Sequence, residues 1–249
     1  MWKTDRRLLI IDMSSEMLRS SRYGEGDQSS FDRFSRNNVF AAECRKYGSV
    51  LETGCSTGFV TRLIVEGGKT RVVGIELDAD AAKAAERYCE RVVNTDLNSD
   101  SWTEAVGEKF DLVTFGDVLE HLLDPTRTLA GSKRLLKPGG RVLICLPNIA
   151  HWTVRVKLLL GKFEYESTGL LDYTHLRFFT VATAKKMLAA AGFKTIWFHP
   201  VFDRLLTKRF RPVWQKIANA APNLFAYQMI FLAEPVSPPA GNVAGRTPQ

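Results

Sequence analysis

The chain has 249 residues, of which 45% are hydrophobic and 24% are charged, and its formal net charge is +7. These proportions are typical of a globular protein with one large core, and the length suits one α/β domain with an inserted cap better than two domains. No apolar run approaches the ~20 residues that span a bilayer, and the four apolar residues 8–11 are too few for a signal peptide. We therefore expect a cytoplasmic protein, at most peripheral to the inner face of a membrane.

The cysteines exclude one class of metal site. Cys44, Cys55, Cys89 and Cys145 are widely spaced and form no CxxC pair, so we interpret them as small, reduced core residues. The sequence predicts no structural zinc site, and no other set of metal ligands stands out.

The N-terminal half of the chain alternates between strand-like and helix-like segments. Residues 1–30 are polar and irregular, which predicts a flexible lead-in, and a helix is expected over 31–46 within a domain that spans 31–234. Short apolar segments bounded by glycine or charged residues are typical of buried parallel strands; they cover residues 49–52, 71–75, 91–94, 110–115 and 141–146. Repeated β-α units of this kind predict a mainly parallel, doubly wound sheet.

Capping residues mark the helices between these strands. Asp78 is a suitable N-cap for a helix over 79–90, and Asp124 followed by Pro125 suits the start of a helix over 125–136. Pro138-Gly139-Gly140 should separate that second helix from the next strand.

After Pro147 the pattern changes. Residues 148–179 are rich in aromatic and polar groups and predict an inserted cap, after which Thr180 should cap a helix that ends at Gly192. Two final strands are expected over 193–199 and 225–233, separated by a basic segment at about 203–222. The proline-rich tail, 235–249, should be disordered.

The loop after the first strand carries the strongest indication of function. Gly54 and Gly58, with Cys55 and Ser56 between them, permit a tight turn and close backbone approach to a ligand at this edge of the sheet. Glu52, two residues earlier, would repel the pyrophosphate of a dinucleotide. A carboxylate here favours a cationic, phosphate-free nucleoside.

Two further acids follow the next strands in register. Glu76, with Leu77 beside it, ends the second strand 24 positions after Glu52, where a carboxylate can accept hydrogen bonds from both hydroxyls of a ribose. Asp96 follows the third strand and is placed to meet an adenine amino group, with Leu97 beside the ring.

These segments resemble the class I S-adenosylmethionine-dependent methyltransferases. Residues 50–58 look like the acid-x-Gly-x-Gly-x-Gly loop of that family, with Ser56 at the middle glycine and Glu52 where aspartate is common; residues 110–122 and 135–140 extend the resemblance, which covers about residues 36–233. The resemblance implies S-adenosylmethionine as cofactor and a Rossmann-like sheet of seven strands, with the last strand antiparallel and inserted beside the fifth.

A base that assists methyl transfer should lie on loops at the same sheet edge. Asp117 follows the fourth strand and His151 follows the fifth. Asp172 and His175 are three residues apart, so a turn could let the acid orient the imidazole; the alternative is that this pair fixes the cap to the core. His121 is interpreted as a structural or cofactor-side residue.

The acceptor is the least determined part of the prediction. The cap is similar to that of bacterial methyltransferases associated with surface-polysaccharide pathways, which implies a small or medium acceptor, such as a sugar or glycan-linked intermediate. Two alternatives stay open: a quinone-like lipid precursor, reached by contact of the basic segment with an anionic membrane, and a catalytically silent binding module. A nucleic-acid acceptor is disfavoured because the Asn/Asp-Pro-Pro-aromatic motif is missing after the fourth strand, and the sequence does not indicate an oligomeric state.

Overall fold

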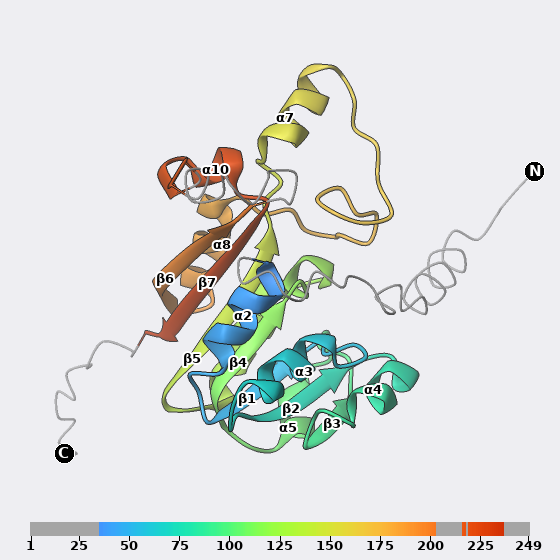
Figure 1. Cartoon of the computed structure of the whole chain (residues 1–249), viewed down its shortest axis with the longest axis vertical. Helices are drawn as coiled ribbons and strands as arrows, with labels where there is room; N and C mark the ends of the chain where they lie inside the picture. The colour runs from blue at the N-terminus through green and yellow to red at the C-terminus, as the bar shows by residue number, and fades with distance from the viewer. Residues whose placement is uncertain (1–34, 203–215, 218, 237–249) are drawn as a thin grey trace, which may run out of the picture.

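The computed structural model describes residues 35–202, 216–217 and 219–236, and within them seven strands form a single sheet (Figure 1). The strands lie in the order β3-β2-β1-β4-β5-β7-β6, and β7 runs antiparallel to both of its neighbours, as expected. The bounds are β1 Ser49–Thr53, β2 Arg71–Glu76, β3 Arg91–Asn94, β4 Phe110–Gly116, β5 Leu136–Pro147, β6 Phe193–Val201 and β7 Gln228–Pro235.

Helices cover both faces of this sheet because nearly continuous apolar strands present side chains to each face in turn. Leu63 and Ile64 of α3 pack on the same face as Val50, whereas Leu129 of α6 packs on the opposite face with Leu51. The first face is covered by α2 Arg36–Cys44, α3 Phe59–Glu66 and α4 Ala79–Ala85, and the second by α5 Trp102–Val106, α6 Pro125–Gly131, the 3-10 helix η3 Ser132–Leu135 and α8 Val181–Ala190. The result is a doubly wound α/β domain with two hydrophobic layers.

The predicted capping residues hold the helix starts. The Asp78 carboxylate accepts the amide of Ala81 at 2.8 Å, and Asp124 accepts that of Arg127 at 3.0 Å. The four cysteines are buried and unbridged, which confirms their reading as core residues.

Several predicted boundaries are wrong, for identifiable reasons. The helix from Ala79 ends at Ala85 rather than at 90, because the amide of Glu90 already bonds to the carbonyl of Val72 in the sheet. The helix from Pro125 ends at Gly131, and Leu136 begins β5 by pairing with Phe110, so Pro138-Gly139-Gly140 lies inside the strand beside a register shift.

The final strand and the chain ends also differ from the prediction. A short helix, α10 Pro222–Phe225, occupies the residues where the last strand was expected to begin, so β7 starts at Gln228 and continues to Pro235. The helix expected over 31–46 is α2, which begins at Arg36 with Ser35 as its N-cap and ends at Cys44. The predicted lead-in over 1–30, residues 203–215 of the basic segment, and the tail after Val236 lie outside the described residues.

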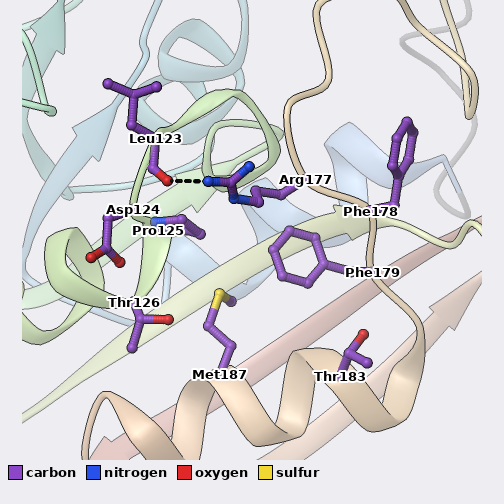
Figure 2. A pocket seen from close by; sticks show the side chains of 9 residues that line it. All are labelled: Leu123, Asp124, Pro125, Thr126, Arg177, Phe178, Phe179, Thr183 and Met187. Atoms are coloured by element: carbon purple, nitrogen blue, oxygen red, sulfur yellow. Dashed lines mark hydrogen bonds between the residues drawn. The ribbon is translucent and has the colours of Figure 1, made fainter.

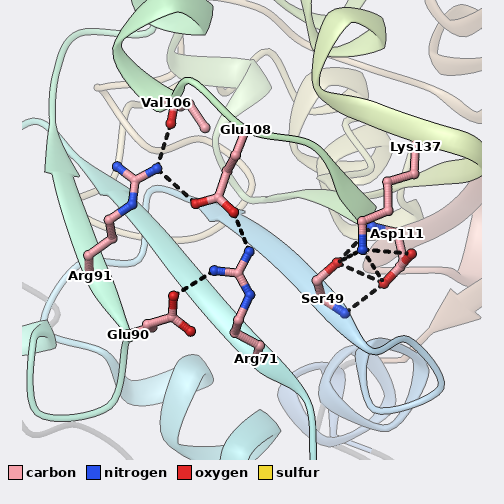
Figure 3. A network of polar contacts seen from close by, with 8 residues as sticks. All are labelled: Ser49, Arg71, Glu90, Arg91, Val106, Glu108, Asp111 and Lys137. Carbon is pink, nitrogen blue, oxygen red and sulfur yellow. Dashed lines mark hydrogen bonds and ion pairs between the residues drawn. The ribbon is translucent and has the colours of Figure 1, made fainter.

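Ion pairs join the strands at their amino ends, on the edge opposite the Gly-rich loop (Figure 3). Arg71 bonds to Glu90 at 2.7 Å and to Glu108, and Arg91 reaches the same Glu108 at 2.9 Å. These groups start β2 and β3 and precede β4, so the network keeps the amino ends of three strands in register.

A second cluster on this edge joins β1, β4 and β5. The Asp111 carboxylate accepts the amide and hydroxyl of Ser49 at 2.8 and 2.7 Å, and Lys137 approaches it to 3.2 Å. Burial opposes ionisation of Asp111, but the bonds from Ser49 and Lys137 outweigh burial and lower its pKa.

The cap, residues 148–179, extends beyond the carboxyl end of β5 (Figure 1). It contains α7 Trp152–Leu159 and long loops, and it has its own small core of Val154, Leu170 and Leu171. No helix in the described ranges is both long and apolar enough to cross a bilayer.

Candidate functional site

The Gly-rich loop has the backbone conformation that its sequence predicts. Gly54 and Gly58 adopt φ angles of 63° and 85°, in the left-handed region, and a Cβ at Gly54 would lie 2.6 Å from Cγ2 of Val118. Ser56, at the position of the family's middle glycine, takes φ 47°, a conformation that is strained for a residue with a side chain. The loop therefore keeps the path of a glycine loop at Ser56.

Glu76 lies where the prediction placed it and fastens this loop. One carboxylate oxygen accepts the amide of Ser56 at 2.8 Å, and the other accepts the amides of Leu77 and Asp78 at 2.8 and 3.0 Å. A carboxylate has about four acceptor positions, so ribose hydroxyls would have to displace at least one of these amides. Glu76 thus holds the loop in place, and it can bind a ribose only if a hydroxyl replaces one of these amides.

Glu52 is more deeply placed than expected. It is buried in β1, and its Oε2 accepts the hydroxyl of Thr61 from α3 at 2.6 Å. Burial raises the pKa of Glu52 to about 7, although Thr61 and the charge of Arg36 favour ionisation. The acid expected to favour a cationic ligand is therefore only half ionised near neutral pH.

The remaining predicted cofactor residues divide into two kinds. Asp96 follows β3, and its Oδ1 accepts the backbone and side-chain N–H groups of Asn98 at 2.8 and 3.1 Å. Leu97, expected beside an adenine ring, is buried in the core with Trp102, which is at odds with a ligand contact. The Cys55 side chain is buried in the opposite core layer, and its amide bonds to the carbonyl of Ile75, so only its backbone is placed to line the loop.

The donor set at this edge fits S-adenosylmethionine. The three acids follow or end adjacent strands, since β1 pairs with β2 and β2 with β3. The loop segments 53–58, 77–78 and 95–98 contain no lysine or arginine. Such a surface suits an ammonium and a sulfonium and gives no counter-charge to a phosphate.

The side chain of Asp117, a predicted base, has one cationic partner and one polar partner. Its side chain forms an ion pair with Arg36 at the start of α2 and accepts the Gln228 amide at 2.9 and 3.1 Å. Its φ of 55° lies in the left-handed region. This arrangement ties the end of β4 to α2 and β7, and the role of Asp117 as a base stays a prediction.

His151 lies at the start of α7. Its Nδ1 bonds to the Thr153 hydroxyl at 2.7 Å and accepts the Thr153 amide at 3.4 Å, and its ring packs edge-on against Tyr227. The neighbouring Asn148 donates its amide to the carbonyls of α10 and Ala226. The structure places His151 as a helix cap, and its role as a base stays a prediction.

The expected hydrogen bond between Asp172 and His175 is not formed. The Asp172 carboxylate accepts the amide and hydroxyl of Thr174 at 2.8 and 2.7 Å, closing a local turn that satisfies the acid within its own loop. Nδ1 of His175 is buried with no hydrogen-bond partner. In the structure the acid therefore does not orient the imidazole of His175, and the alternative, that the pair fixes the cap to the core, stays a prediction.

The structure instead brings His175 to Glu120 and His121, which sequence reasoning did not connect. The ligand atoms of these three side chains all lie within 4.8 Å of one another, and the rings of His121 and His175 are 4.9 Å apart. Glu120 and His121 belong to the 3-10 helix η2 Leu119–His121 after β4, and His175 comes from the cap. We refer to these three residues as the Glu120 cluster.

Burial sets the protonation of this cluster. It raises the pKa of Glu120 to about 8 and lowers that of His121. Burial, with repulsion from His121, also lowers the pKa of His175 to about 4. Both imidazoles are therefore neutral near pH 7.

Backbone bonds join the cluster to the cap. The carbonyl of Glu120 accepts the amides of Leu176 and Arg177 at 2.8 and 3.0 Å, and Nδ1 of His121 lies 3.2 Å from the Thr174 carbonyl. The Arg177 guanidinium donates to the carbonyl of Leu123 at 2.7 Å (Figure 2), so it fixes the cap rather than standing free for an anion.

A cavity of about 380 Å³ is lined by residues that follow these segments closely in the chain (Figure 2). Its walls come from the residues that follow His121 and those that follow His175, together with α8. They are Leu123, Asp124, Pro125, Thr126, Arg177, Phe178, Phe179, Thr183 and Met187.

Comparison with known proteins agrees with the fold. Residues 29–196 match the family model described as a methyltransferase domain. Over 103 residues the chain is 33% identical to a ubiquinone biosynthesis O-methyltransferase of Pseudomonas fluorescens, a match that covers 40% of this chain and 44% of that protein. The chain thus spans less than half the length of the first curated relatives it matches.

Solved structures show the same fold at low identity. The magnesium protoporphyrin IX methyltransferase of Synechocystis PCC 6803, with bound SAH, aligns with a TM-score of 0.59 at 16% identity, covering 93% of this chain and all of that one. The 1,6-didemethyltoxoflavin-N1-methyltransferase of Burkholderia thailandensis aligns with a TM-score of 0.57 at 17% identity, over 95% and 93% of the two chains. With its seven-stranded sheet and Gly-rich loop, the chain belongs to the family of S-adenosylmethionine-dependent methyltransferases.

Proposed function

We propose that this protein transfers the methyl group of S-adenosylmethionine to a hydroxyl oxygen of a quinone-like aromatic precursor. The observation that carries the methyl-transfer part is the register of three acids on adjacent strand ends, next to a glycine loop with left-handed φ angles. Glu76 would bind the ribose, and the edge around Glu52 would hold the cationic end of the cofactor. When bound, S-adenosylmethionine supplies an activated methyl group.

The protein itself must then position the acceptor oxygen and exclude water. Residues at the cap side of the sheet edge, above all the Glu120 cluster, provide polar groups in a buried setting. His175 has a neutral imidazole with an unpartnered Nδ1 there, but its pKa of about 4 makes it a weak base on its own. Asp117, His151 and Asp172 have other hydrogen-bond partners, so His175 is the favoured proton acceptor among the predicted candidates.

The acceptor class is supported by the relatives and by the cap surface. Relatives that match over 40% of the chain carry the name ubiquinone biosynthesis O-methyltransferase, which favours the quinone alternative over the sugar acceptor expected from the sequence. The cap also exposes Trp152 and the run Leu158, Leu159 and Leu160. Exposed apolar side chains of this kind suit an acceptor that is delivered from a lipid phase.

A two-part assay tests the proposal. Calorimetry with S-adenosylhomocysteine on the purified full chain should show binding, and labelled S-adenosylmethionine should methylate a prenylated catechol but neither a sugar nucleotide nor RNA. Methylation of the sugar alone would overturn the acceptor assignment. Cofactor binding without turnover on any acceptor would favour the silent binding module, and absence of cofactor binding would refute the proposal as a whole.

A further inference from the structure

The Glu120 cluster contains the most unusual polar groups of the described chain. Glu120 is fully buried, and neither of its carboxylate oxygens has a hydrogen-bond partner; Nδ1 of His175 is buried and unpartnered as well. A buried polar atom without a partner costs about 1–3 kcal/mol, and more when the group is charged. Such orphaned atoms side by side indicate a missing common partner, for which an ion is a recognised explanation.

Among the residues that the structure describes, no side chain is free to neutralise Glu120. Arg36 is the cation that acts on Glu120, but its guanidinium is paired with Asp117. A positive ligand from outside the chain would satisfy both orphaned oxygens of Glu120 together.

His121 is oriented in the way that metal ligands usually are. Its Nδ1 is 3.2 Å from the Thr174 carbonyl. A metal-bound imidazole typically donates its other N–H to a carbonyl or carboxylate, which fixes the ring and the tautomer. His121 thus has one nitrogen directed to the backbone, and His175 has a buried Nδ1 without a hydrogen-bond partner.

We propose that Glu120, His121 and His175 bind one divalent transition-metal ion of the zinc type. Two imidazole nitrogens and one carboxylate favour such an ion over Mg²⁺ or Ca²⁺, which prefer oxygen ligands. Ligands of a tetrahedral site lie ~3.3 Å apart when the metal–nitrogen bond is about 2.0 Å. Since the ligand atoms already lie within 4.8 Å of one another, small side-chain rotations close the site.

Three protein ligands leave a position open for an oxygen ligand. Resting on the proposed function, this position is where the acceptor hydroxyl would bind. A Lewis acid lowers the pKa of a bound hydroxyl, so the hydroxyl would release its proton to water near neutral pH. Its oxygen would then take the methyl group as the methyl–sulfur bond of S-adenosylmethionine breaks and S-adenosylhomocysteine leaves. In this arrangement His175 would be a metal ligand, and this role would replace its proposed role as proton acceptor.

Metal binding is measured first, without reference to methyl transfer. Full-length protein is stripped with a chelator and titrated with Zn²⁺ by calorimetry, and with Co²⁺ by visible absorption. We expect one ion per chain, Co²⁺ bands characteristic of nitrogen ligation, and a rise in melting temperature with Zn²⁺. Glu120→Gln and His175→Ala should each weaken binding at least tenfold, a loss of about 1.4 kcal/mol or more.

The matched control is His199→Asn. His199 is a partly buried histidine on β6 that stacks on Trp197, and it belongs to the edge strand of the sheet. This variant should bind Zn²⁺ like the wild type. If Glu120→Gln does not fold, His121→Asn replaces it in the comparison.

The outcomes separate this proposal from the proposed function. If wild-type protein binds S-adenosylhomocysteine but takes up no Zn²⁺ or Co²⁺, the metal site is overturned and the proposed methyl transfer is unaffected. Unchanged metal affinity in the cluster variants would have the same meaning. Stoichiometric metal binding that the cluster variants lose would establish the site, even if no aromatic acceptor were methylated.

Discussion

Individual residues at this sheet edge combine structural and chemical roles. Glu52 is the clearest case, because the sequence identifies it as a cofactor-side acid and the structure buries it against Thr61. Glu76, which we propose binds the ribose, similarly accepts three loop amides. Both acids should therefore affect stability as well as affinity.

We predict that Glu52 makes the protein less stable as the pH rises. Its folded pKa is about 7 against 4.5 for the free group, so between these values the unfolded chain releases a proton that the folded chain keeps. The free energy of unfolding should fall through this window and level off above it. Glu52→Gln should remove that dependence, so its melting temperature relative to wild type should increase from pH 4.5 to pH 8.

The control for this measurement is Glu164→Gln, which changes an exposed acid in the cap. Its melting temperature should follow that of the wild type at every pH. A difference between Glu52→Gln and wild type that stays flat across the window would show that Glu52 is ionised in the fold.

Glu76→Ala should weaken binding of S-adenosylhomocysteine at least tenfold. The substitution removes a charged acceptor that is worth roughly 1.5–3 kcal/mol and also frees the Ser56 amide that shapes the loop. Calorimetry measures the affinity, with Glu86→Ala, an exposed acid that follows α4, as control. Equal affinity in both variants would remove Glu76 from the ribose site.

At this scale the sequence predicts positions better than environments. Glu52, Glu76 and Asp96 could be placed because each has a fixed spacing from a strand end. The burial of Glu120 and the ion pair between Arg36 and Asp117 could not be predicted, because both depend on segments that are far apart in the chain. Glu120 and His175 are 55 residues apart, and Arg36 and Asp117 are 81 residues apart. The one signal for Glu120 was its place beside His121 in the segment after the fourth strand.

At the scale of elements, local hydrogen bonding fixes where strands and helices end. The parallel strands were predicted well because their apolar runs have no competing interpretation. Helix ends were predicted poorly, since tertiary bonds such as that from Glu90 to Val72 overrule local preference. The start of β7 was missed for a similar reason: Pro222 begins a short helix in an apolar stretch that resembles a strand.

Asn148 shows how much one side chain can hold an element in place. It is fully buried after β5, and its amide donates to the carbonyls of Pro222, Asn223 and Ala226, at 3.3, 3.2 and 2.7 Å. Asn148→Ala should lower the free energy of unfolding by about 1–3 kcal/mol, because it leaves buried carbonyls without a donor.

Urea denaturation measures this loss, and Asn219→Ala, at an exposed asparagine near α10, should change it by less than about 0.5 kcal/mol. Equal stability of the two variants would mean that α10 is held by other contacts.

At the scale of the whole molecule, the two edges of the sheet have different tasks. The amino edge is held by the ion pairs of Figure 3, whereas the carboxyl edge carries the glycine loop, the Glu120 cluster and the cap. The cap adds an exposed apolar surface at its outer end, where Leu159 is 86% exposed and Leu160 66%.

We predict that this apolar surface increases binding to lipid vesicles. Sedimentation with anionic liposomes at moderate salt should recover wild-type protein in the pellet, and Leu159→Ser combined with Leu160→Ser should reduce the bound fraction severalfold, since burial of apolar area stabilises such contacts. Val236→Ser, at an exposed apolar residue after β7, serves as control. Equal recovery of all three proteins would rule out the cap leucines as the contact.

The bonds from Leu176 and Arg177 to the carbonyl of Glu120 have a consequence for engineering. They join the cap to the segment after β4 that holds Glu120. If the cap selects the acceptor, a chimera that imports only residues 148–173 from a relative keeps this connection and His175, and it should acquire a new specificity with its chemistry intact. An exchange that runs on to 179 also replaces His175, so such hybrids should fold but turn over slowly.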